Sequence, residues 1–524
     1  MKRLDKKRSL LNVSVSISFK FALLFFSILV KRFLIQYIGN EVNGLNALYL
    51  SIIGCLSVVE LGVGSAIAFS MYKPIVEGDK PRVAALYQLF TKSYWVIGGI
   101  IFIIGLALIP TLPYLAKDYA SIDVNLYLTF FLVLVSVVIT YLYNAKTALI
   151  NAYKNDYVTT TITSCASILQ CVLQILTLVW TRSFIWYLIC RIIAGIVQWL
   201  AVEIFVRLKH RDILQIKKQS LDVETKADIK RNIKAMFMHK VGTALVNSAD
   251  SIIISAFIGI ALLGKYSNYA AIITAMMSVI TLFFTPLTSI IGHMFVAEKE
   301  LAQRYYEFFY ALNFVIGIVF FGGYYAIIDN LVAILFGIGL ELPKSVSFVI
   351  TVNYFVQFMR QSTLLFRDAT GTFYNDRWKP LFEGITNVIL SVAFVILFTK
   401  FFGEAIGIVG VIAATIVTNL IICHIVEPYV LYKYAFCATS KKHLIMNYLY
   451  IAAFTIELVV LGLLMRSFGN QWLELFVNGC ISMGLAVLLC GVTFASNKEF
   501  RYFLSVFLNK KIRHIFAKKD KENL

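Results

Sequence analysis

Long apolar segments separated by short polar connectors run along almost the whole chain. A helix that crosses a bilayer needs about 20 predominantly apolar residues, and fourteen segments come close to or exceed that length. They are 10–38, 44–71, 88–110, 123–145, 158–180, 184–206, 235–258, 263–292, 305–328, 345–370, 381–399, 405–432, 445–465 and 473–495. The pattern predicts an all-α polytopic membrane protein with about 14 transmembrane helices, and no connector is long enough to form a separate soluble domain.

The first segment, 10–38, carries a stripe of polar residues on one face. Since a helix turns by about 100° per residue, five polar positions share that face. They are Ser9, Ser16, Lys20, Ser27 and Lys31. A charged side chain at the centre of a membrane helix costs roughly 2.5–3.5 kcal/mol. The stripe is therefore expected to face a water-accessible cavity or the interior of a helix bundle.

The stripe recurs 220 residues later in the chain, in the segment 235–258. Polar positions and helix-end glycines repeat at that offset: Lys20 with Lys240, Ser27 with Asn247, Lys31 with Ser251, Gly39 with Gly259 and Gly44 with Gly264. Because each copy holds six predicted spans, the copies are parallel and related by a pseudo-two-fold axis along the membrane normal. Transporters built from such repeats bind their substrate between the copies.

These repeats divide the chain into four predicted parts. Residues 1–206 form an N-terminal six-helix lobe, and 207–234 form a cytoplasmic linker. Residues 235–434 form a C-terminal six-helix lobe, and 435–524 add two helices and a basic tail.

Lys and Arg are distributed unevenly between the two sides of the predicted membrane. With the N-terminus inside, the cytoplasmic segments hold 34 of the 48 and the opposite side holds 6. This bias predicts that both termini are cytoplasmic. The net charge of +19 then reflects topology and attraction to anionic membrane lipids, and it does not indicate nucleic-acid binding.

Two short stretches resemble a known family. ELGVGSA (60–66) is similar to the Glu/Asp-Leu-Gly-x-Gly-Ser-Ala motif of polysaccharide repeat-unit (Wzx-like) flippases, and GNEVNGL (39–45) resembles their first outer turn. That family belongs to the multidrug/oligosaccharidyl-lipid/polysaccharide (MOP) exporter superfamily, together with multidrug and toxin extrusion antiporters and the lipid II flippase. The resemblance implies flipping of undecaprenyl-diphosphate-linked oligosaccharides across the bacterial cytoplasmic membrane, for capsule, O-antigen or exopolysaccharide synthesis. It also implies alternating access around a cationic cavity, and polysaccharide polymerases and glycosyltransferases as candidate partners.

Cations within the spans are the candidate ligands of an anionic diphosphate headgroup, which needs positive charge and hydrogen-bond donors. They are Lys20, Lys31, Arg32, Lys240, Arg360 and Arg367. Five of the six have a second interpretation. Lys20 and Lys240 could extend toward the cytoplasmic interface, and Lys31 and Arg32 could mark the outer edge of a shorter helix. Arg367, beside Asp368, could form a structural ion pair.

Embedded acids are candidates for ion coupling or gating, since an acid within a span marks an ion pathway or the partner of a cation. Asp250 and Glu60 are the main candidates, with H+ or Na+ as the coupled ion. Asp250 is predicted at the depth of Lys31, where a static pair between the two is the alternative. Glu203 and Glu427 are expected near the cytoplasmic interface, and Glu457 is a further embedded acid.

Other chemistry finds little support in the sequence. The eight Cys occur without C-x-x-C or Cys/His spacing, so we expect no metal, no disulfide and no cofactor. The six His form no catalytic motif, so we expect a transporter and not an enzyme. Two alternatives remain open: a cation-coupled multidrug exporter of the same fold, and a membrane-embedded polysaccharide enzyme.

Overall fold

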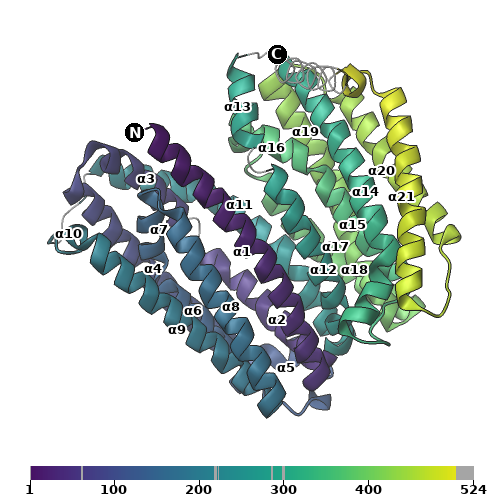
Figure 1. Cartoon of the computed structure of the whole chain (residues 1–524), viewed down its shortest axis with the longest axis horizontal. Coiled ribbons are helices and arrows are strands. Elements are labelled where there is room, and N and C mark those ends of the chain that lie inside the picture. The colour runs from purple at the N-terminus through teal and green to yellow at the C-terminus, as the bar shows by residue number, and fades with distance from the viewer. Residues whose placement is uncertain are drawn as a thin grey trace, which may run out of the picture. The chain divides into compact units, whose positions relative to one another are not determined.

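The computed structural model of the chain describes residues 2–60, 63–217, 221, 223–284, 287–297, 301–502 and 505 (Figure 1). Within these ranges, the side chains at 2–16, 65–66, 223–224, 226, 228, 231–240, 247, 283, 289–290, 296–297 and 373 are not described. Every regular element in the described ranges is a helix. The all-α prediction is thus confirmed for this part of the chain.

The helices group into two compact units, each of which is described separately. The first unit comprises Met1–Ala275, Leu335–Gly337 and Pro380–Val411. Its helices are α1 (Lys2–Tyr37), α2 (Asn40–Leu56), α3 (Val63–Glu77), α4 (Lys80–Leu108), α5 (Leu112–Leu115), α6 (Leu126–Tyr141), α7 (Asn144–Ala152), α8 (Asp156–Thr181), α9 (Phe184–Lys209), α10 (Arg211–Leu214), α11 (Val223–Ile253), most of α12 (Ile260–Phe284) and α17 (Lys379–Phe402), and the start of α18 (Glu404–Thr418). Here α1 packs along α8, α8 along α9, and α11 along α2.

The second unit comprises Met276–Ile334, Ile338–Lys379 and Ile412–Leu524. Its helices are the end of α12, α13 (Leu287–Ala297), most of α14 (Ala302–Phe336), α15 (Lys344–Met359), α16 (Gln361–Thr370), the end of α18, α19 (His424–Leu431), α20 (Lys441–Leu464) and α21 (Gln471–Ser496). The π-helical turn η7 (Asn419–Cys423) joins α18 to α19. The compact units describe packing, whereas the four predicted parts follow the sequence repeat, and those boundaries stay a prediction.

Local sequence signals explain several helix ends. Asp79 caps α4 by accepting a hydrogen bond from the Arg82 amide at 3.0 Å, and Asn470 caps α21 by accepting from the Trp472 amide at 3.0 Å. Such caps satisfy amide groups that have no partner inside the helix. Gly371, at φ 72°, ends α16 in the left-handed conformation that favours glycine.

Eleven helical segments of the described chain are long and apolar enough to cross a membrane. They are Asn40–Glu60, Lys80–Leu115, Leu126–Ala152, Asp156–Thr181, Phe184–Lys209, Val241–Ile258, Ala302–Phe336, Lys379–Phe402, Glu404–Phe436, Lys441–Leu464 and Gln471–Ser496. The predicted spans 10–38, 263–292 and 345–370 are not among them. The helix over 345–370 breaks at Arg360, which leaves segments of 16 and 10 residues. The chain is a multi-pass membrane protein, and the number fourteen stays a prediction.

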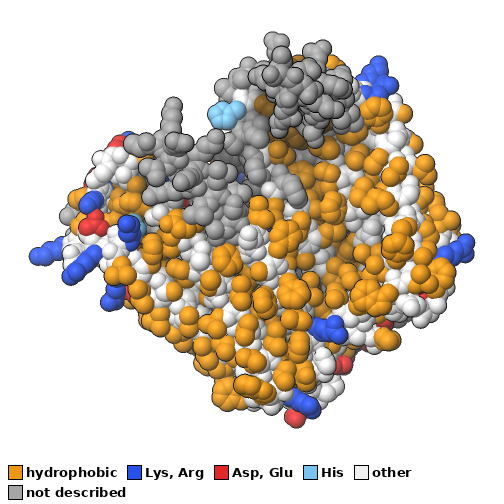
Figure 2. All heavy atoms as spheres, viewed as in Figure 1, with side chains coloured by type: hydrophobic (Ala, Val, Ile, Leu, Met, Phe, Trp, Pro, Cys, Tyr) orange, Lys and Arg blue, Asp and Glu red, His pale blue; other side chains and the backbone are white. Residues whose placement is uncertain are grey.

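Hydrophobic side chains cover most of the visible surface of both units, and the charged side chains shown lie mainly toward the ends of the helices (Figure 2). Large apolar residues on α17 and α21 are exposed, such as Phe382, Ile389, Phe476 and Leu488. Continuous apolar exposure of this kind is unusual for a soluble protein. It is the surface expected where lipid replaces water as the solvent.

One helix contact in the first unit has the symmetry that the repeat predicts. A Cβ atom on Gly44 of α2 would overlap the carbonyl of Ile260, and a Cβ on Gly264 of α12 would overlap the carbonyl of Asn40. Each pair of equivalent residues, Gly44 with Gly264 and Asn40 with Ile260, is separated by 220 positions. Reciprocal contacts of this type arise at a two-fold axis. The backbones approach closely because both positions lack a side chain.

The orientation in the membrane remains a prediction, and single cysteines can test it. Lys209 and Lys400 are both exposed, but the positive-inside bias predicts Lys209 in the cytoplasm and Lys400 outside. In a background without the native cysteines, Lys400→Cys should react with an impermeant thiol reagent in intact cells. Lys209→Cys should react only after lysis, and the opposite result would reverse the assignment.

Candidate functional site

Lys31 is held inside the first unit by neutral partners. Its ammonium donates to the backbone oxygen of Ser267 at 2.6 Å and to the Ser267 hydroxyl at 2.9 Å. It also lies 5.9 Å from the centre of the Phe336 ring, within range of a cation–π interaction. Among the described residues no carboxylate lies within ion-pair distance of Lys31. An ammonium has three donor hydrogens, so one donor remains for a ligand.

Polar side chains of α2 and α12 surround this lysine. The Asn43 amide nitrogen donates to the carbonyl of Gly264 at 3.1 Å, to the Ser267 hydroxyl at 3.0 Å and to the Asn268 side-chain oxygen at 3.1 Å. Asn43 and Asn268 are buried, and buried amides form such bonds because an unsatisfied polar group is costly. Ser267 thus joins Lys31 to a polar contact between α2 and α12.

The other predicted residues of the stripe occupy different environments. Lys20 on α1 is half-buried and Arg32 is exposed, and the side chain of Lys240 lies outside the described residues. Asp250 on α11 is half-buried, but no ion pair joins it to Lys31 in the described part of the chain. The predicted proximity of Asp250 to Lys31 is thus not present as a direct contact.

Glu60 ends the short 3-10 turn η1 (Ser57–Glu60) and accepts a hydrogen bond from the Tyr94 hydroxyl of α4. A Cβ on Gly64 would overlap that hydroxyl and would lie 3.3 Å from the Glu60 carboxylate. The second glycine of the ELGVGSA motif therefore leaves room for this bond. Gly62 lies outside the described residues. Sequence reasoning missed Tyr94, which sits in another span without any motif.

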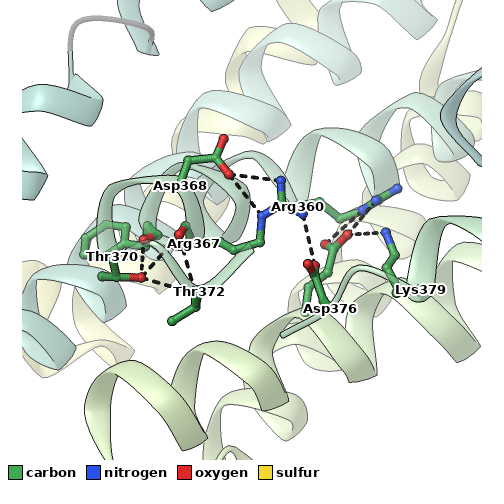
Figure 3. Close-up of polar contacts among 9 residues, drawn as sticks. Arg360, Arg367, Asp368, Thr370, Thr372, Asp376 and Lys379 are labelled. Atoms are coloured by element: carbon green, nitrogen blue, oxygen red, sulfur yellow. Dashed lines mark hydrogen bonds and ion pairs between the residues drawn. The ribbon is translucent and has the colours of Figure 1, made fainter. Parts of the chain in front are cut away.

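Arg360 lies at the junction of α15 and α16 in the second unit and is bound by a buried carboxylate (Figure 3). Its Nη2 and Nε donate to the two oxygens of Glu427 at 2.6 and 3.1 Å, and its Nη1 donates to Asn419 at 2.6 Å. Lys379 donates to the same carboxylate at 2.5 Å. Two cations thus converge on one acid, in the bidentate geometry that makes Arg–carboxylate pairs strong.

The depth of Glu427 in the membrane stays a prediction, but the structure buries its side chain among other helices. Its side chain is only 1% exposed, and that of Lys379 is 4% exposed. The sequence places Lys379 in a connector 48 residues from Glu427, and nothing in the local pattern links the two. The packing of α19 against α16 brings Glu427 to Arg360, and Lys379, the first residue of α17, reaches the same carboxylate.

Arg367 also forms ion pairs, in line with the structural alternative considered for it (Figure 3). Its Nη1 donates to Asp376 at 3.0 Å, and its Nη2 donates to Asp368 at 3.0 Å. The Asp376 side chain is fully buried, so this pair fixes the turn that follows α16. No group of three His, Cys, Asp or Glu able to hold a metal ion occurs among the described residues.

Comparison with known proteins identifies the fold but no close relative. No protein-family model matches the chain, and no curated protein matches it. A multidrug resistance MATE family transporter of the MOP superfamily, in an inward-facing conformation, is 14% identical with a TM-score of 0.63, covering 84% of this chain and 98% of its own. Lipid II flippase MurJ, in an inward closed conformation, is 11% identical with a TM-score of 0.61, covering 92% and 98%.

A third solved structure is a MOP superfamily transporter from Pyrococcus furiosus. It is 16% identical with a TM-score of 0.54, and the match covers 84% of this chain and 95% of that one. All three structures are transporters, and the matches extend over nearly their full lengths. At these identities the likeness concerns the fold alone. The chain therefore has the fold of the MOP superfamily transporters.

Proposed function

We propose that this chain flips undecaprenyl-diphosphate-linked oligosaccharide repeat units across the bacterial cytoplasmic membrane by alternating access. Three findings support the proposal: the MOP transporter fold, shared with a lipid II flippase; the Glu60 motif, which resembles Wzx-like flippases; and the neutral partners of the half-buried Lys31. Polysaccharide polymerases and glycosyltransferases remain the expected partners.

The observation that carries the proposal is the partner set of Lys31. An ammonium removed from water normally requires a nearby negative charge, but the described partners of Lys31 are a hydroxyl and a carbonyl. Such a cation favours an anionic ligand, and a lipid diphosphate supplies the missing charge through strong charge-assisted hydrogen bonds. Lys31 is therefore the first diphosphate ligand in this proposal.

The remaining site residues take graded roles. Lys20 and Lys240 share the predicted stripe and extend the cationic face, and Arg32 is a surface cation close to Lys31. Arg360 and Arg367 are already bound by carboxylates, so a headgroup reaches them only after an acid releases them.

Coupling to H+ or Na+ is proposed through an embedded acid, for which Asp250 and Glu60 are the candidates from the sequence.

A multidrug exporter is the second candidate function, favoured by the MATE family neighbour. An organic cation would be repelled by Lys31, which is why we prefer the flippase.

Reconstituted vesicles test the proposal directly. Purified protein is incorporated into liposomes that contain a fluorescent polyprenyl-diphosphate sugar, and flipping is followed by accessibility to an impermeant reductant. A hydrogen bond to a charged group contributes about 1.5–3 kcal/mol, so Lys31→Met should slow flipping by about 10- to 100-fold.

The matched control is Lys400→Met, which removes an exposed cation and should flip at the wild-type rate. Wild-type protein that moves an organic cation and not the lipid would favour the exporter. An unchanged rate in Lys31→Met would remove Lys31 from the site.

A further inference from the structure

Glu457 of α20 lies at the contact of three helices in the second unit, α14, α20 and α21, whose labels lie close together in Figure 1. Glu457 is buried, with only 4% of its surface exposed. Gly322 of α14 and Ser482 of α21 lie beside it: a Cβ on Gly322 would stand 3.2 Å from Glu457 Oε1 and 3.3 Å from Ser482 Oγ. Gly322 thus provides the space that the carboxyl group occupies.

Neither oxygen of Glu457 has a hydrogen-bond partner, and no ion pair involves it in the described part of the chain. Two other buried acids of this unit differ from Glu457 because their carboxylates have hydrogen-bond partners. Glu427 binds two cations, and Glu474 accepts from the amides of Phe468 and Gly469 at 2.7 and 2.9 Å. An ionised carboxylate without such partners costs several kcal/mol in a buried site, so the group becomes neutral instead. A protonated, neutral Glu457 avoids this cost.

Polar pockets lie at the two ends of the same three helices. One pocket, of about 350 Å³, is formed near the α20–α21 connector and includes Asp329, Gly462, Arg466, Glu474 and Asn478. The other, of about 380 Å³, is formed at the opposite helix ends and includes Glu307, Tyr310, His443, Tyr450 and Glu499. Every one of the three helices runs from one pocket to the other. Glu457, Gly322 and Ser482 all lie between them.

Glu457 is closer to the pocket at the α20–α21 connector. Gly462 is five residues further along α20, a rise of about 7.5 Å, and Asn478 is one helical turn from Ser482 on α21. The Tyr325 hydroxyl of α14 adds a polar group there, because it lies 3.2 Å from the Cβ position of Gly462. Side chains able to relay a proton thus extend from Glu457 toward this pocket.

In the other direction an aromatic layer separates Glu457 from the second pocket. Phe454, one turn away on α20, is stacked on Phe355 with ring centres 3.7 Å apart. Phe314 is stacked on Tyr450 with centres 4.2 Å apart. These rings are buried and Phe side chains cannot transfer a proton. The polar groups identified among the described residues, Ser482 beside Glu457 and Tyr325 near Gly462, thus lie on the opposite side of this layer.

Other titratable groups lie on the helices packed around Glu457. They include Tyr325 of α14, whose hydroxyl lies 3.2 Å from the Cβ position of Gly462, and Cys490 of α21. His424 of α19 meets α20 at Asn447, ten residues before Glu457. On α15 the ionic residue is Lys344, which pairs with Asp329 at 2.6 Å.

We propose that Glu457 is a proton-binding site of the α14–α20–α21 helix group, loaded from the pocket at the α20–α21 connector, and that release of its proton drives flipping. The coupling of proton release to flipping rests on the proposed function, whereas the proton-binding site does not depend on it. A sodium ion fits less well, since it requires several oxygen ligands and Ser482 is the oxygen identified beside the carboxyl group.

Infrared spectroscopy of the purified protein tests the proton site alone. Near neutral pH the wild type should show the carbonyl stretch of a protonated carboxylic acid, and Glu457→Gln should lack that band. The control Glu77→Gln removes a half-exposed carboxylate and should keep it. Gly322→Ala places a Cβ close to Glu457 Oε1 and should shift the band. This variant replaces Glu457→Gln in the test if Glu457→Gln does not fold. If Glu457→Gln loses no such band relative to the wild type, Glu457 is ionised and the proposal is overturned.

Flipping under a pH gradient tests the coupling. Wild-type vesicles should flip faster with the gradient, and Glu457→Gln should lose that stimulation while Glu77→Gln keeps it. Stimulation that persists in Glu457→Gln, or stimulation by a sodium gradient alone, overturns proton coupling through Glu457. If the wild type flips no lipid at all, the proposed function fails, and the infrared result still decides the proton site.

Discussion

Replacing Glu427 by Gln is expected to lower the free energy of unfolding by about 3–5 kcal/mol, the usual effect of removing one partner from a buried ion pair. The loss is large because two cations, Arg360 and Lys379, share this carboxylate. Without it, both are left in a buried site without their counter-charge. We expect less monodisperse protein and a lower unfolding temperature in detergent.

The matched control for this variant is Glu404→Gln. Glu404 forms an ion pair with Lys117 at 2.8 Å, but its side chain is 58% exposed. Exposed pairs contribute about 0–1 kcal/mol, so its unfolding temperature should stay close to the wild-type value. Equal effects of the two substitutions would contradict a structural role for the buried cluster.

A compensating variant separates a structural role from substrate binding at Arg360. Combining Glu427→Leu with Arg360→Met and Lys379→Met removes every charge of the cluster, and such replacements are often neutral or stabilising. Restored folding together with restored flipping would make the cluster a structural element. Restored folding without flipping would return Arg360 to the substrate site.

Gly44→Ala and Gly264→Ala are each expected to break the close contact between α2 and α12. The added Cβ would overlap a backbone carbonyl of the facing helix, and backbone cannot move aside as a flexible side chain can. The helices must separate, so the bonds from Asn43 to Gly264 and Ser267 are lost with the contact. Flipping should fall strongly, since the proposed site at Lys31 depends on Ser267.

Cross-linking measures this separation. Cysteines placed at Asn43 and Ser267, whose side-chain atoms are 3.0 Å apart, should be joined by a short thiol reagent in the wild-type background. The yield should drop when Gly264→Ala is added. Gly99→Ala on α4 is the control, because a Cβ there meets no atom within 4 Å. Full cross-linking in the Gly264→Ala background would contradict the contact.

The apolar pattern was sufficient to predict an all-helical, multi-pass membrane protein. In lipid only a structure with internal backbone hydrogen bonds is tolerated, so long apolar segments leave little choice of fold class. The offset of 220 residues also predicted a specific relation, and the reciprocal contacts of Gly44 and Gly264 agree with it. Both signals can be read along the chain, because one consists of the hydropathy of each segment and the other of glycines that recur at helix ends.

Partner choice among the charged side chains was decided by the tertiary structure alone. From the sequence, Lys31 and Arg360 were both candidate ligands of the diphosphate, and Glu427 had no predicted partner. In the folded chain Arg360 meets Glu427, 67 residues away, while Lys31 meets the neutral Ser267, 236 residues away. Helical periodicity states which face a residue occupies, but not which helix covers that face. The strength of an ionic contact depends on distance and burial, and both are set by the packing of distant helices.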